Sequence, residues 1–91
     1  MMKNLKQKTD KALRTAQYKS TFLTTTEFMA RKGKTVYISK EFHQKLNLLV
    51  FMLGGGKVTL ADYLQNLLQH HFEDFGAEMK ELYGKTDKPN F

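Results

Sequence analysis

The chain of 91 residues contains no cysteine, no tryptophan and a single proline. Without cysteine, neither a disulfide framework nor a thiolate metal site can form. No apolar run approaches the roughly 20 residues that a membrane-spanning helix requires. A secretory signal has an apolar stretch after its basic start, and no such stretch follows the basic N-terminal segment of this chain. These absences favour a cytoplasmic protein that does not contact membranes.

Acidic residues are scarce in the first part of the chain. Residues 1–40 hold ten Lys or Arg and only two acidic residues, Asp10 and Glu27, a net charge of +8. Residues 41–91 hold five Lys and seven acidic residues, a net charge of −2, which gives +6 for the whole chain. This asymmetry favours a polyanionic partner, most commonly nucleic acid. A solvated basic arm without a specific partner fits the charge equally well.

The pattern divides the chain into three parts. Residues 1–30 are expected to form a largely flexible basic arm, because Leu5, Leu13 and Ala16 are too sparse for an apolar stripe. Residues 31–84 form the predicted domain, and residues 85–91 a tail. The arm could wrap a duplex, contact a partner protein or remain solvated; its cations are Lys3, Lys6, Lys8, Lys11, Arg14 and Lys19.

Within the predicted domain, one strand and two helices are expected. Residues 34–38 alternate polar and apolar, which predicts a strand with Val36 and Ile38 on one face and Thr35 and Tyr37 on the other. Ser39 is a good N-cap for a helix over residues 40–53, which is apolar on nearly all sides and must be covered on several.

Glycines 54–56 end this first predicted helix, since glycine just past the last turn is a frequent stop. Thr59 then opens a second helix that reaches Tyr83. The spacing of Thr59 and Asp62 resembles a capping box with Asp in place of Glu.

A lone strand leaves both edges unpaired, and pairing with the same strand of a second copy would satisfy them. The expected fold is therefore mainly helical with one short strand, an intertwined homodimer around a two-stranded antiparallel ribbon. The stretch KTVYISKEFHQKLNLLVFMLGGGKVTLADYLQNLLQHHF resembles the ribbon-helix-helix family of repressors and plasmid proteins. The expected dimer core is Val36, Ile38, Phe42, Leu46, Leu49, Val50, Leu53, Tyr63, Leu64 and Leu67.

A narrower resemblance extends from Tyr18 to Tyr83, through YKSTFL, GKTVYIS, LGGGKVTLADYLQNLLQHHF and KELY. These segments look like an uncharacterised family encoded on conjugative and mobilisable transposons of anaerobic gut bacteria. Its genes often lie near those of a partition-type ATPase and a relaxase. The two resemblances imply a dimeric, sequence-specific binder of double-stranded DNA that acts in transfer, mobilisation, excision or autoregulation, with the ATPase or relaxase as further partners.

The ribbon-helix-helix resemblance implies that the outward strand residues Thr35 and Tyr37 contact bases in the major groove. Gly33 departs from the long polar or basic residue that many members carry at the third outward position. The expected phosphate contacts flank the strand and open the second helix; they are Arg31, Lys32, Lys34, Lys57, Val58 and Thr59. Ordinary exposed strand residues and simple helix capping explain these residue types without DNA.

No residue pattern indicates an enzyme, a cofactor or a small-molecule substrate. In GGGKVT, Val58 separates Lys57 from Thr59, whereas a phosphate-binding loop has Ser or Thr directly after Lys. His70 and His71 point about 100° apart on a helix, so they do not chelate one metal. The main alternative to specific DNA binding is a protein-interaction adaptor, antitoxin-like or partnered with a partition ATPase. An RNA-binding or general nucleoid protein is a third possibility.

Overall fold

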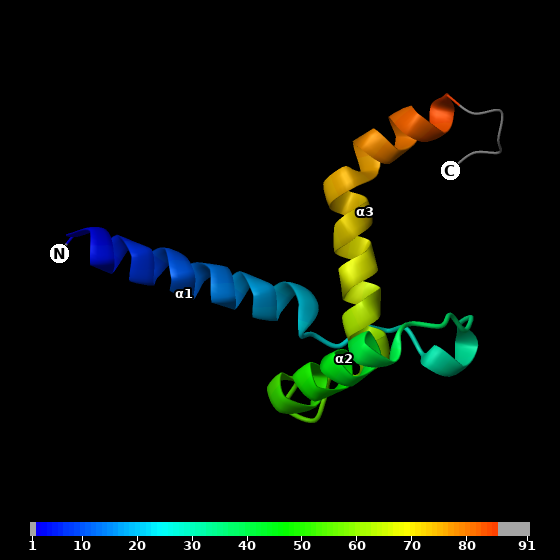
Figure 1. The fold of residues 1–91 in the computed structure, drawn as a ribbon, viewed down its shortest axis with the longest axis horizontal. Helices are drawn as coiled ribbons and strands as arrows, with labels where there is room; N and C mark the ends of the chain where they lie inside the picture. Colours follow the sequence, from blue (N-terminus) through cyan, green and yellow to red (C-terminus); the bar gives the residue numbers. More distant parts are fainter. Residues whose placement is uncertain (1, 86–91) are drawn as a thin grey trace.

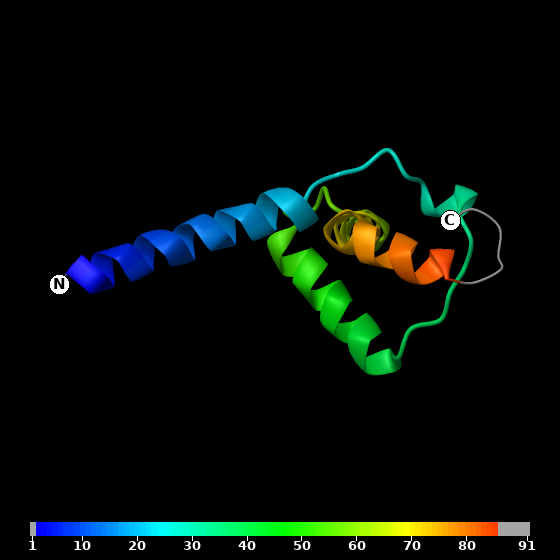
Figure 2. The same cartoon turned by 90° about the horizontal axis from the view of Figure 1, so that it is seen from above.

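The computed structural model describes residues 2–85, and the side chains from residue 10 onward. Its elements, in chain order, are helix α1 (Met2–Phe22), the short 3-10 helix η1 (Ala30–Lys32), helix α2 (Lys40–Leu53) and helix α3 (Leu60–Gly84). Helices α1 and α2 each pack against α3. Most of α1 extends away from the other helices in both views (Figures 1 and 2). Of the tail expected over residues 85–91, residues 86–91 lie outside the described part of the chain.

Helices α2 and α3 begin where local capping predicts. The Ser39 hydroxyl accepts a hydrogen bond from the Phe42 backbone N–H at 3.2 Å. At α3, the Thr59 hydroxyl accepts from the Asp62 backbone N–H, and the Asp62 carboxylate accepts from the Thr59 N–H, both at 3.0 Å. The predicted capping box is confirmed, because its two hydrogen bonds depend only on residues three positions apart.

The turn between α2 and α3 depends on the three consecutive glycines. The Gly54 N–H donates to the Val50 carbonyl, which closes the last turn of α2. Gly55 and Gly56 have φ values of 63° and 74°, in the left-handed region where a Cβ is strained. The chain can therefore reverse within a few residues and bring α3 against α2.

Two glycine substitutions are expected to change stability in opposite directions. Gly56→Ala should lower the free energy of unfolding by about 1 kcal/mol, because alanine is strained at positive φ. Gly76→Ala should raise it by about 0.5–1 kcal/mol, because Gly76 lies within α3 and an added Cβ meets no atom within 4 Å. Urea denaturation of both variants measures the difference. Equal shifts in the same direction would contradict this assignment of the turn.

The expected strand and the ribbon-helix-helix fold are wrong: the described residues form an all-helical structure without a strand. Residues 34–39 connect η1 to α2 without regular secondary structure and have no strand pairing in the described chain. Val36, expected to face the helices, is 76% exposed. The alternating pattern reflects only a local preference, whereas a strand requires a hydrogen-bonded neighbour that lies elsewhere in the structure.

Residues 2–22, which the sequence pattern assigned to a flexible arm, form helix α1. Its C-terminal end packs on α3 through Tyr18 and Phe22, which are one helical turn apart. The preceding part of α1 has no neighbouring helix in either view (Figures 1 and 2). α1 is thus attached at one end.

The core of the single chain is small. Its buried apolar residues are Leu23, Val50 and Tyr63, with six partly buried side chains packed around them. Of the residues expected in a dimer core, Val50 and Tyr63 are buried, and Leu46, Leu49 and Leu64 are partly buried; Val36, Ile38, Phe42, Leu53 and Leu67 are exposed. The radius of gyration of 17.2 Å exceeds the roughly 12 Å of a compact chain of this length.

Candidate nucleic-acid interface

The residues expected to contact phosphate lie in two separate places. Arg31 and Lys32 belong to η1, and Lys34 follows it in the segment before α2. Lys57, Val58 and Thr59 lie in the turn after α2, at the opposite end of that helix (Figures 1 and 2). Because the 14 residues of α2 span about 21 Å, the two groups do not form one cluster within a chain.

The expected base contacts, Thr35 and Tyr37, are both exposed, and Tyr37 is 98% exposed. Their neighbours Val36 and Ile38 are exposed as well, so the segment has no buried face opposite to an outward one. Gly33 ends η1, and a Cβ there would meet the ring of Phe28 at 2.6 Å. Gly33, which departs from the ribbon-helix-helix pattern, thus allows the Phe28 ring to pack closely on the backbone.

The N-terminus of α3 is already occupied by a carboxylate. Asp62 is buried and accepts from the Thr59 N–H, one of the free donors of the first helical turn. A phosphate at this position would compete with the Asp62 charge. Lys57, which is exposed in the preceding turn, is therefore a better phosphate contact than the backbone of Val58 or Thr59.

Helix α1 presents the densest group of cations outside these two places. Lys11, Arg14 and Lys19 are exposed, and the described part of the chain offers them no ion-pair partner. Lys11 and Arg14 line a shallow depression of about 360 Å³ together with Thr15 and Tyr18. Lys11 and Lys19 border a second one of about 470 Å³. These charges are free to meet an external polyanion.

Aromatic side chains hold α1 on α3. The Tyr18 and Tyr63 hydroxyls share a hydrogen bond of 2.5 Å. Burial, and then the contact with Tyr18, raises the pKa of Tyr63 to about 12, so the Tyr63 hydroxyl is neutral at physiological pH. The ring of Phe22 lies edge-on to that of His70, with centroids 5.2 Å apart. Because these residues come from two helices, they fix the direction in which α1 leaves the body.

The segment after α1 is tied to α3 by Asp62 and Asn66. The Asp62 carboxylate accepts from the Thr26 N–H at 3.0 Å and from the Thr26 hydroxyl at 2.9 Å. The Asn66 amide donates to the carbonyls of Phe22 and Thr24 at 3.2 and 2.9 Å. Burial raises the pKa of Asp62, but the hydrogen bonds from Thr59 and Thr26 together outweigh it and lower the pKa below its usual value.

The sequence pattern that describes a family of proteins of unknown function, DUF3408, matches residues 1–86. The chain belongs to the DUF3408 family. Comparison with the curated proteins gave no significant match. The same holds for the solved structures. The family match includes α1, so the basic helix lies within the region that defines the family.

The described residues of this DUF3408 chain contain neither a metal-binding cluster nor a membrane-spanning helix. No three His, Asp or Glu side chains among them lie close enough together to hold a metal ion. No helix of the described part combines the length and apolar character needed to cross a membrane.

The sequence pattern did not predict the hydrogen bonds and aromatic contacts between the N-terminal region and α3. Asp62 was identified only as the capping partner of Thr59, and its contact with Thr26 joins residues 36 positions apart. Tyr18 and Phe22 carried a usable signal, because two aromatic residues four positions apart lie on one face of a helix. That spacing indicates that this end of the helix packs against another element. In this DUF3408 chain the element is α3, which contributes Tyr63 and His70 to the contact.

Proposed function

We propose that the chain binds double-stranded DNA as a dimer, as an accessory or regulatory protein of a mobile genetic element. The observation that carries the proposal is the projecting helix α1, whose exposed Lys11, Arg14 and Lys19 have no ion-pair partner among the described residues. Residues 2–22 contain six cations and one acidic residue. Duplex DNA presents about one negative charge per 1.7 Å of its axis, so a basic helix of this kind gains affinity by releasing counterions.

The dimensions of α1 suit a duplex. Its 21 residues span about 31 Å, close to one turn of B-DNA, and the major groove is wide enough to admit a helix. Since α1 is attached only at its C-terminal end, the opposite end can follow the duplex without displacing the core. Arg31, Lys32 and Lys34 extend the basic surface into the loop before α2.

We assign direct contacts with the bases to Thr35 and Tyr37, as the ribbon-helix-helix resemblance implied. The two-stranded ribbon that would place them in the major groove is not formed in the described chain. Their exposure supports the assignment, because neither side chain is committed to the core. Phosphate contacts supply affinity and base contacts supply specificity. Affinity and specificity can therefore be tested separately, by substituting the residues that contact phosphates or those that contact bases.

The test compares the wild type with a Thr35→Ala/Tyr37→Ala variant on the DNA that flanks its own gene and on a scrambled duplex. We expect the wild type to prefer its own flanking DNA by at least about tenfold, which corresponds to about 1.4 kcal/mol, and the variant to bind both duplexes alike. Fluorescence anisotropy over a salt series measures both affinities. Unchanged preference in the variant would remove Thr35 and Tyr37 from the readout.

A second candidate function is a protein-interaction adaptor with non-specific DNA affinity. It is favoured by the second half of α3, where the exposed Phe75 and Leu82 lie among the acidic residues Glu73, Asp74, Glu78 and Glu81. Such a surface fits a basic partner helix, for example on a partition-type ATPase or a relaxase. Tight and specific DNA binding by the isolated protein, without a stable protein partner in pull-down, would count against this alternative.

A further inference from the structure

The outer face of α2 carries an uncovered apolar ridge. Leu48, Phe51 and Met52 are three and four positions apart, so they lie side by side on one face of the helix. Their side chains are 64%, 79% and 65% exposed. The buried Val50 lies on the other side of α2, toward Tyr63 and α3. α2 is thus apolar on two faces, of which the chain itself covers one.

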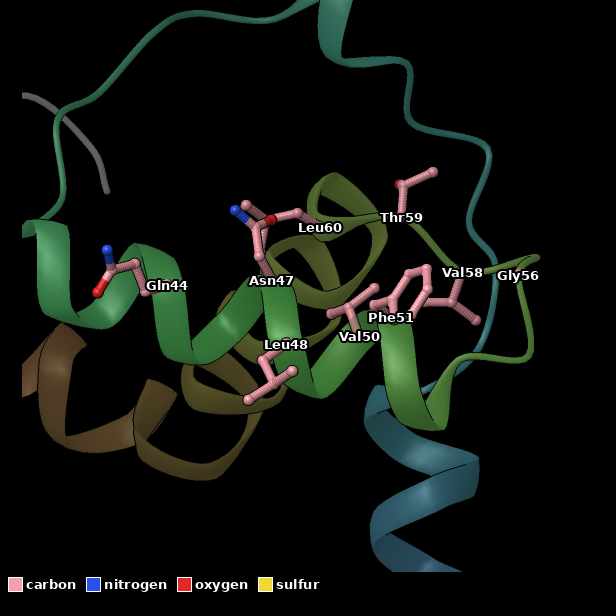
Figure 3. A pocket seen from close by; sticks show the side chains of 9 residues that line it. All are labelled: Gln44, Asn47, Leu48, Val50, Phe51, Gly56, Val58, Thr59 and Leu60. Atoms are coloured by element: carbon pink, nitrogen blue, oxygen red, sulfur yellow. The ribbon is translucent and has the colours of Figure 1, made fainter.

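A groove runs beside this ridge, between α2 and the chain that leads into α3 (Figure 3). Its volume is about 820 Å³, and its lining includes the apolar Val58 and Leu60 together with the polar Gln44, Asn47 and Thr59. Leu48 and Phe51 border it on the α2 side, as the close-up shows. No charged side chain lines the groove. Ridge and groove are therefore neighbours on one surface.

The surface that the single chain leaves uncovered is large enough for a stable interface. The accessible surface of 8539 Å² compares with roughly 5,500 Å² for a compact monomer of 10.6 kDa. The surplus of roughly 3,000 Å² is several times the about 800 Å² that each partner buries in a standard interface. Part of this surplus belongs to the projecting helix α1 (Figure 1), and part to the exposed apolar side chains of α2, which a second copy can cover.

We propose that this face of α2 is a homodimer interface, in which the Leu48/Phe51/Met52 ridge of each copy packs into the groove of the other. A two-fold axis places two identical surfaces face to face, so a surface that carries both a ridge and its groove complements itself. The absence of charge along the groove matters in a chain of net charge +6, since it lets two copies approach without facing cations there.

This interface deepens the proposed DNA binding, because a dimer would present two α1 helices to one duplex, but it is tested without DNA. Sedimentation equilibrium of the wild type, over a concentration series up to about 100 µM, should give twice the chain mass of 10.6 kDa. Phe51→Glu should raise the dissociation constant at least about 100-fold, since burying two phenylalanine side chains stabilises a dimer by several kcal/mol.

Leu82→Glu is the matched control, because Leu82 is 66% exposed but lies at the far end of α3. It should leave the dissociation constant unchanged. Circular dichroism should show equal helix content in both variants, since neither side chain belongs to the core. A monomeric wild type, or a dimer lost with Leu82→Glu and kept with Phe51→Glu, would overturn the proposal.

The absence of cysteine allows an independent proximity test in the full chain. Leu48→Cys and Met52→Cys should each form covalent dimers with a short bismaleimide, and Leu82→Cys should not. If Leu82→Cys alone forms the covalent dimer, two copies associate elsewhere and the proposed face is wrong. Neither experiment depends on DNA, so failure of the interface and failure of the DNA-binding proposal are distinguishable.

Discussion

Replacing Lys11, Arg14 and Lys19 together by glutamine is expected to weaken binding to duplex DNA by about 100-fold at 0.1 M salt. All three side chains are exposed on α1 and lack ion-pair partners in the described chain, so each can contact a phosphate. Each lost phosphate contact should also lower the slope of log K against log salt by about 0.9. Glutamine has a helix propensity close to those of lysine and arginine, so α1 itself should persist.

The matched control removes the same charge from other parts of the chain. Lys45, Lys80 and Lys85 are exposed on α2 and at the end of α3. Their replacement by glutamine also lowers the net charge from +6 to +3. We expect a loss of less than about fivefold in this control, because general attraction between exposed charges is largely screened beyond about 10 Å at 0.1 M salt. Equal losses in both variants would contradict a specific role of α1.

Asp62→Ala is expected to cost about 3 kcal/mol of the free energy of unfolding. The buried carboxylate accepts from Thr59 and twice from Thr26. Its loss removes the capping box, worth about 1 kcal/mol, and leaves the Thr26 donors without their acceptor. Asp74→Ala, at an exposed position of the same helix, should change stability by less than about 0.5 kcal/mol.

The pH dependence of stability provides a second readout of Asp62. Its pKa is lower in the folded chain than the ordinary value of 3.8, because the hydrogen bonds from Thr59 and Thr26 outweigh the opposing effect of burial. The folded state therefore binds fewer protons here than the unfolded state. The stabilisation is complete above the unfolded pKa and is lost as the pH falls through the folded pKa. Urea denaturation between pH 7 and pH 2 should show this acid limb diminished in Asp62→Ala; an unchanged limb would contradict the assignment.

The sequence predicted α2 and α3 because their limits depend on local chemistry. Ser39, Thr59 with Asp62, and the glycine turn act within a few residues, so their roles can be inferred without knowing the fold. The predicted second helix ended at Tyr83, and α3 ends at Gly84. The wrong strand at residues 34–38 has the opposite cause. Its residue types favour an extended backbone, but strand pairing depends on segments distant in sequence, and the described residues supply no such partner.

The sequence predicted the positive charge of the candidate nucleic-acid interface but not the arrangement of the residues that form it. The excess of cations in residues 1–40 is visible in the sequence, but the projection of α1 depends on Tyr18, Phe22 and Asn66 meeting α3. The sequence also placed Arg31 and Lys57 on one DNA-binding surface, which followed from the ribbon. Without the ribbon, Arg31 lies in η1, which precedes α2, and Lys57 lies in the turn that follows α2.

The most direct test of the proposed function is the affinity of the wild-type protein for duplex DNA as a function of salt. Anisotropy of a labelled duplex should give a linear plot of log K against log salt with a slope of about −4 or steeper, since Lys11, Arg14, Lys19 and the cations around η1 would together make about five phosphate contacts. The absence of binding at about 50 mM salt, where such contacts are strongest, would contradict the proposal and leave the adaptor function as the better account.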